Sequence, residues 1–140
     1  MDKINKVLAT SKRIARLLTD GFQANRSADN SIRATWAAEI TFDTGDVLEV
    51  LETHKISGSS VQFGFNYHFM DVERKCRFRL DTHGQEYPPG EPCHVHVGEN
   101  EQIVENGSGR LCGYGLERID FLVAFHLANQ FLKGRKLPWD

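Results

Sequence analysis

Two histidines separated by one residue, His94 and His96, are the side chains of this chain best suited to chemistry. They lie in the short segment from Cys93 to Val97, whose other positions are small or apolar. Successive side chains of a strand point to opposite faces, so a strand here would place both imidazoles on the same face. Paired imidazoles can bind a metal ion or transfer protons near neutral pH. The spacing indicates a chemical site without naming the reaction.

Further segments show the period-two alternation of half-buried strands, and they are the elements that must position this pair. The expected strands are residues 32–42, 47–52, 61–70, 75–81 and 93–97. A tight turn at 44–46 joins the first two, a charged turn at 71–74 joins the third and fourth, and a proline-rich loop leads into the last. We therefore expect an antiparallel sheet of about five strands.

Helical patterns flank the predicted sheet. Residues 3–18 form an apolar stripe opposite basic residues, and residues 22–31 are polar and have the composition of a linker. The glycines of 98–115 discourage regular structure, whereas 116–133 are broadly apolar and Gly134 follows them as a helix stop. The prediction is an α+β fold, with an N-terminal helix, the sheet, and a C-terminal helix packed on the apolar sheet face.

Length and composition favour a single globular domain of 140 residues, with 1–31 as the N-terminal helix and linker and 32–140 as the sheet and C-terminal helix. A net charge of -2 excludes nucleic-acid binding through an overall positive field, so any such contact would be local. No apolar run approaches the roughly 20 residues of a membrane span, and no secretory signal opens the chain. Three cysteines without CxxC spacing suit a reducing compartment. We expect a cytoplasmic protein.

One face of the predicted sheet collects polar side chains. Alternation in the last three strands places together Asn66, His68, Arg77, Arg79, Asp81, His94 and His96, and His83 follows closely. The opposite, apolar face carries Tyr67, Cys76, Phe78 and Leu80. Exposed sheet faces normally carry Thr, Lys and Glu, so a cluster of His, Arg and Asp is a candidate site. Arginine can bind a phosphate, and aspartate can orient an imidazole or bind a metal.

Two known signatures do not fit. His94, His96 and Glu101 imitate the first metal motif of cupins, but the flanking glycines fall at the wrong offsets and no second half-motif follows. Metzincin, P-loop and dinucleotide-binding fingerprints are absent from the sequence.

Three motifs in order resemble those of the TumE-type toxins, small bacterial proteins usually encoded beside a helix-turn-helix antitoxin. They are Phe65-Asn66-Tyr67-His68, Phe78-Arg79-Leu80-Asp81 and Cys93-His94-Val95-His96-Val97, within a resemblance over about residues 32–132. The family patterns are aromatic-x-Tyr-His, Arg-x-Asp and His-His-x-His-Val, so Cys93 stands where the first histidine would be. The resemblance implies a site formed by Tyr67, His68, Arg79, Asp81, His94 and His96.

The function expected from the face and the resemblance together is that of a toxin-like, metal-independent ribonuclease. One of His94 and His96 would deprotonate the ribose 2′-hydroxyl, and the other of the pair or His68 would protonate the leaving oxygen. Arg79 would stabilise charge on phosphorus, and Asp81 would orient an imidazole. The residues expected to contact substrate are Asn66, Tyr67 and Arg77.

Two alternatives stay open at this point. In one, His94, His96 and Asp81 bind a divalent metal that activates water for phosphoester hydrolysis. In the other, the face is a non-catalytic module that docks a protein. The expected partners are a helix-turn-helix antitoxin and RNA, without a membrane, and self-association is left open.

Overall fold

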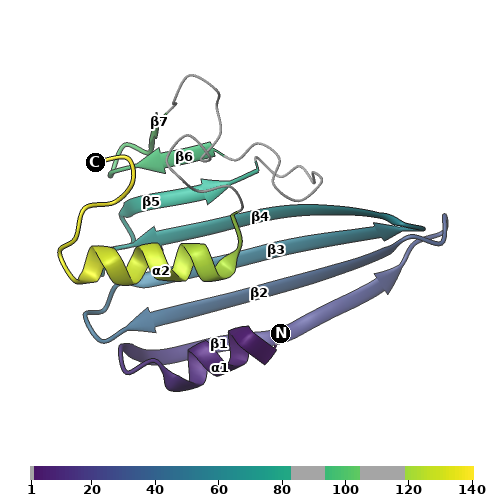
Figure 1. The fold of residues 1–140 in the computed structure, drawn as a ribbon, viewed down its shortest axis with the longest axis horizontal. Helices are drawn as coiled ribbons and strands as arrows, with labels where there is room; N and C mark the ends of the chain where they lie inside the picture. The colour runs from purple at the N-terminus through teal and green to yellow at the C-terminus, as the bar shows by residue number, and fades with distance from the viewer. Residues whose placement is uncertain (1, 83–93, 105–118) are drawn as a thin grey trace.

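A computed structural model describes residues 2–82, 94–104 and 119–140, which form two helices and one antiparallel sheet (Figure 1). The helices are α1 (Asp2–Thr10) and α2 (Phe121–Leu132). The strands are β1 (Ile14–Arg26), β2 (Ile32–Phe42), β3 (Val47–Ser57), β4 (Ser60–Met70), β5 (Cys76–Asp81), β6 (His94–Val97) and β7 (Gln102–Val104). Each strand pairs with the next in sequence. The α+β class is confirmed, with seven strands instead of about five.

Strand β1 overturns the prediction for the N-terminal segment. The expected helix over 3–18 ends at Thr10, and the expected linker over 22–31 is largely strand, paired with β2 from Ile14 to Arg26. The apolar residues of this segment fit a helical stripe as well as a strand. Register shifts at Ile14/Arg16 and Thr19/Phe22 also interrupt the alternation that would have revealed the strand.

Strand β7 corrects the prediction for the glycine-rich connector. Gly98, at a φ of +78°, begins the turn after β6, and Gln102–Val104 then pair antiparallel with β6. Glycine adopts a positive φ at little steric cost because it has no Cβ, so Gly98 allows a tight turn between β6 and β7. Part of the connector is thus regular structure, and residues 105–118 lie outside the described residues.

Helix α2 packs on one face of the sheet. Phe121 contacts Trp36 at a ring-centroid distance of 5.1 Å, and Phe131 contacts Phe69 at 5.6 Å. Asp120 caps the first turn, because its carboxylate accepts a 3.0 Å hydrogen bond from the amide of Val123. The predicted stop is confirmed, since Gly134 follows the helix at a φ of +71°. Neither described helix is long and apolar enough to cross a membrane.

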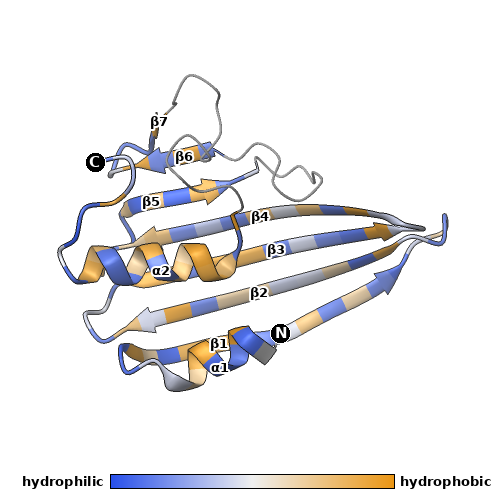
Figure 2. Cartoon of the chain, viewed as in Figure 1, coloured by the Kyte–Doolittle hydropathy of each residue, from blue (hydrophilic) through white to orange (hydrophobic). Residues whose placement is uncertain are grey.

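The two faces of the sheet differ in character. Helix α1 packs Ile4, Val7 and Leu8 against the same core as α2, so both described helices lie on one side, here called the helix face (Figure 1). Figure 2 shows that α2 consists largely of hydrophobic residues and that the colours along the strands are mixed, as alternation produces. The other side, here called the open face, carries no helix among the described residues.

Candidate functional site

A row of polar side chains crosses the open face. Residues directly opposite one another on antiparallel strands point to the same side, and the register aligns one such residue from each of five strands. The row consists of Glu39, Glu49, His68, Arg79 and His96. Their sequence neighbours on β4 and β5, Tyr67 and Leu80, are buried in the core of the helix face. The chain therefore presents two histidines with an arginine between them on three adjacent strands.

A second row lies beside the first. Asn66 stands opposite Asp81, and Asp81 stands opposite His94. The alternation prediction of a shared face is thus confirmed for six residues, namely Asn66, His68, Arg79, Asp81, His94 and His96. His94 is half-buried, whereas His96 is only 5% exposed. The two imidazoles share a face but differ in access to solvent.

Cys76 and Arg77 lie on the faces opposite to those predicted. A register shift between Phe69 and Met70 pairs Met70 with Cys76, which turns Cys76 toward the open face. Arg77 instead lies on the helix face, with its guanidinium 4.6 Å from the ring centroid of Phe131. A bulge adds a residue to one strand and re-aims the side chains beside it, and alternation alone does not reveal it. Arg77 is therefore removed from the predicted substrate-binding residues.

Tyr67 also lies apart from the open-face cluster, although the resemblance included it in the site. It is fully buried on the helix face, as alternation predicted, and its hydroxyl donates a 2.6 Å hydrogen bond to Glu52. His83 and Cys93, named in the sequence analysis, lie outside the described residues.

Carboxylates hold Arg79 in place. Its Nε donates a 2.7 Å hydrogen bond to Oδ2 of Asp81, and its Nη1 donates to Oε1 of Glu101, in the turn between β6 and β7. His96 joins this network, since its Nδ1 lies 3.1 Å from the carbonyl oxygen of Glu101 and its Nε2 lies 3.4 Å from Oδ2 of Asp81. A carbonyl oxygen only accepts, so Nδ1 carries the proton in that contact. These contacts fix the orientations of the Arg79 guanidinium and the His96 imidazole.

His68 is the open-face imidazole that borders a groove. Its side chain is 22% exposed and borders an open groove of about 700 Å³ over β1 to β4, which Glu39, Glu49 and Leu51 also line. Burial lowers the pKa of His68 below its usual 6.5, and Arg79 lowers it further, while Glu101 opposes both effects. The imidazole is therefore neutral at pH 7 and able to accept a proton.

The residues best placed to bind a metal differ from the predicted set of His94, His96 and Asp81. Among the described residues, ligand atoms of His68, Cys76 and Glu101 lie within 4.8 Å of one another. Burial raises the pKa of the Cys76 thiol to about 11, so this thiol is protonated near neutral pH.

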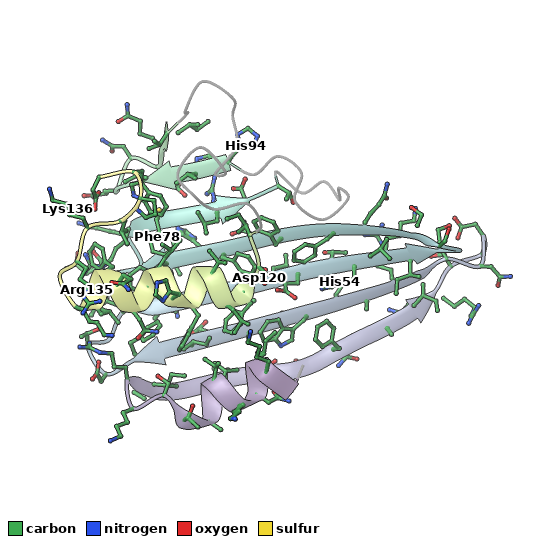
Figure 3. The ribbon with its side chains drawn as sticks, in the orientation of Figure 1. His54, Phe78, His94, Asp120, Arg135 and Lys136 are labelled. Atoms are coloured by element: carbon green, nitrogen blue, oxygen red, sulfur yellow. The ribbon has the colours of Figure 1, made fainter. Side chains whose placement is uncertain are left out.

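A second polar cluster, missed in the sequence analysis, lies on the helix face. Glu52 is 4% exposed and accepts from Tyr67, while Nε2 of His54 lies 3.2 Å from its other oxygen. His54 lies near Phe63, at a centroid distance of 4.7 Å, and beyond the beginning of α2 (Figure 3). A carboxylate at an apolar position of an alternating strand was the available signal, since a buried charge needs partners.

The fold and the open face together define a class, a small α+β protein with one meandering antiparallel sheet, helices on one face, and histidine, arginine and carboxylates on the other. A family model described as Toxin TumE matches residues 6–119. The chain belongs to this TumE toxin family, and the resemblance seen in the motifs is confirmed. No curated protein and no solved structure matches the chain.

Proposed function

We propose that this TumE-family protein is the toxin of a toxin–antitoxin pair and that it cleaves RNA on the open face without a metal cofactor. The observation that carries the proposal is the register of His68, Arg79 and His96 on adjacent strands. Strands lie about 4.8 Å apart, so the two strands that carry histidines are separated by about 10 Å. That spacing suits a phosphodiester seated above the arginine, with one imidazole on either side.

The roles follow from access and charge. His68 borders the groove and removes the proton of the ribose 2′-hydroxyl, and an imidazole of β6, His94 or His96, protonates the leaving 5′-oxygen. Arg79 stabilises the negative charge that develops on the phosphoryl oxygens. Asp81 orients both Arg79 and His96 through the contacts described above. Asn66, next to His68 along the groove, contacts the RNA.

The test is RNA cleavage by purified protein in the presence of a chelator. The expected products carry 2′,3′-cyclic phosphate ends, because the 2′-oxygen attacks phosphorus. His68→Ala is expected to lower the rate by about 10²-fold or more, the usual contribution of a general base. His126→Ala is the matched control, since His126 is exposed on α2 and contacts Gln130. RNA left intact by the chelated parent, or a His68→Ala variant as growth-inhibitory as the parent, would refute the proposal.

His94→Ala and His96→Ala assign the acid on β6. Loss of the acid slows cleavage of RNA strongly but spares a substrate whose leaving group needs no proton, such as a nitrophenyl ester. Loss of a residue that only positions other groups instead slows cleavage of both substrates alike. The variant that spares the activated substrate identifies the acid.

We further propose that the partner is a helix-turn-helix antitoxin encoded beside this protein, because the family is a toxin family. Coexpression with the adjacent reading frame is expected to restore growth and to yield a complex that co-purifies. An unrelated neighbouring gene, or growth that the neighbour does not restore, would contradict this pairing.

A further inference from the structure

We propose that His68, Cys76 and Glu101 bind a divalent transition metal ion of the zinc class, and that the bound ion silences RNA cleavage. Metal binding stands independently of the proposed function. The inhibition of RNA cleavage rests on the proposed function, since inhibition requires His68 to act as the base.

The three side chains come from separate elements and converge on one point of the open face. His68 belongs to β4, Cys76 begins β5, and Glu101 lies in the turn between β6 and β7. One ligand atom of each lies within 4.8 Å of the other two. In a tetrahedral zinc site with bonds of about 2.0–2.3 Å, neighbouring ligand atoms are about 3.3–3.8 Å apart. Side-chain adjustments of about an ångström would complete the site.

The backbone aims two of these side chains in an unusual way. The bulge at Phe69/Met70 turns Cys76 out of the helix-face core and toward His68, and bulges commonly re-aim side chains beside functional sites. Glu101 has a φ of +50°, a conformation that residues other than glycine rarely adopt. Both backbone features bring a potential metal ligand, a thiol in one case and a carboxylate in the other, toward the imidazole of His68.

His68 supplies an independent indication of a ligand. Its Nε2 is buried from solvent and has no hydrogen-bond partner among the described residues, with Oε1 of Glu101 at 3.8 Å. Leaving a buried polar atom without a partner is unfavourable, and such atoms call for an explanation such as a bound ion. A metal ion accepts the lone pair that this nitrogen offers.

The donor set selects the class of ion. Metal binding displaces the proton of the Cys76 thiol to solvent. The resulting thiolate and an imidazole favour zinc and similar soft ions over magnesium or calcium, which prefer oxygen ligands. Arg79 already donates to Oε1 of Glu101, which leaves Oε2 for the metal and orients the carboxylate as outer partners of metal ligands do. Three protein ligands leave a fourth position for water.

Metal binding and base catalysis compete for the same imidazole. If zinc binds Nε2 of His68, the ring proton stays on Nδ1, and the imidazole has no lone pair left to accept the proton of a ribose hydroxyl. The nearby Arg79 disfavours a second cation, so the ion is expected to be exchangeable rather than permanently held. The expected result is reversible inhibition by zinc.

Cobalt titration of the untagged protein tests the site directly. In a Cys93→Ser, Cys112→Ser background, Cys76 is the sole thiol. One equivalent of Co²⁺ is expected to give a thiolate-to-cobalt charge-transfer band, which zinc then displaces. Cys76→Ala is expected to lose the band, and Glu101→Gln to weaken affinity by about 10-fold or more. Circular dichroism of each variant verifies its fold.

Glu99→Gln is the matched control for Glu101→Gln. Glu99 lies two residues away in the same turn, is exposed, and pairs with Lys75. Binding unchanged in this variant supports the site. Absence of the band, or equal losses of affinity in the two glutamine variants, would overturn it.

RNA cleavage with added zinc separates this inference from the proposed function. Zinc is expected to inhibit the parent, and Cys76→Ala is expected to cleave at the same rate with and without zinc. Metal binding by a protein that never cleaves RNA would overturn the proposed function and leave the metal site standing. Cleavage that requires zinc would overturn both silencing and the metal-independent mechanism.

Discussion

The hydroxyl of Tyr67 donates a 2.6 Å hydrogen bond to Oε1 of Glu52, a carboxylate that is only 4% exposed. The other oxygen, Oε2, lies 3.2 Å from Nε2 of His54. Both carboxylate oxygens therefore have a partner on the helix face, among aromatic rings. This arrangement makes Tyr67 a support for a buried charge, apart from the open-face cluster that the resemblance associated with it.

Tyr67→Phe is expected to lower the free energy of unfolding by about 1–3 kcal/mol, because a buried acceptor loses its donor. Urea denaturation measures the change. A double-mutant cycle with Glu52→Met, which removes both acceptor oxygens, should show that the two losses are not additive, since both variants remove the same hydrogen bond. Additive losses, or an unchanged Tyr67→Phe, would mean that the pair contributes little.

Arg77→Met is expected to destabilise the fold while leaving RNA cleavage at the parent's rate. The guanidinium lies over Phe131, and its Nε donates a 2.8 Å hydrogen bond to Asp46, whose side chain is 6% exposed. Losing both contacts should cost about 1–3 kcal/mol in thermal or urea denaturation. A stable variant with impaired cleavage would instead return Arg77 to the substrate site.

Period-two alternation correctly predicts which sheet face a side chain lies on where the strands pair regularly. Residues 61–70 alternate without interruption, so the opposite placement of Tyr67 and His68 was predictable, and so was the shared face of His94 and His96. The same logic failed at Cys76 and Arg77, because a bulge depends on how β4 and β5 pair and leaves no mark on the period of one strand.

Strand β1 and the position of Glu101 could not be predicted from the sequence for the same physical reason. Strand β1 contains two register shifts and fits a helical stripe equally well, so its pairing with β2 is decided by tertiary contacts. In the sequence, Glu101 is marked only by its place in an incomplete cupin-like motif. Its approach to Arg79 and His68 depends on the turn that Gly98 begins and that returns the chain as β7.

Arg79→Lys tests whether the planar guanidinium matters beyond its charge. Lysine keeps a cation between His68 and His96, but it cannot link Asp81 and Glu101 in the geometry that Arg79 provides. RNA cleavage is expected to fall by about 10²-fold, the typical loss when one donor that stabilises developing charge is removed. Circular dichroism and denaturation should show a folded protein.

Arg79→Ala, which removes the whole guanidinium, is expected to lower the stability of the fold more than Arg79→Lys does. It leaves Asp81, 3% exposed, without its guanidinium partner, and breaking a buried pair in this way costs about 3–5 kcal/mol. If lysine and alanine variants cleave RNA and unfold alike, Arg79 does not act through its two carboxylates.

Asp71 is expected to make stability depend on pH. Its Oδ1 accepts hydrogen bonds from the amides of Lys75 at 3.0 Å and Glu73 at 2.8 Å, in the turn between β4 and β5. The bond from Lys75, and then that from Glu73, lower the pKa of Asp71 below its usual 3.8, while burial opposes them. A depressed pKa means that the folded state favours the carboxylate. The resulting stability is present above the unfolded pKa and is lost as the pH falls through the folded value.

Asp71→Asn isolates this contribution, because the amide oxygen keeps an acceptor at the turn but has no charge to lose. The parent should be the more stable protein above about pH 4, and the difference should shrink as the pH is lowered through the depressed pKa. Urea denaturation of both proteins across that range measures the difference. A gap that stays constant with pH would show that the turn stabilises the carboxyl and the carboxylate equally.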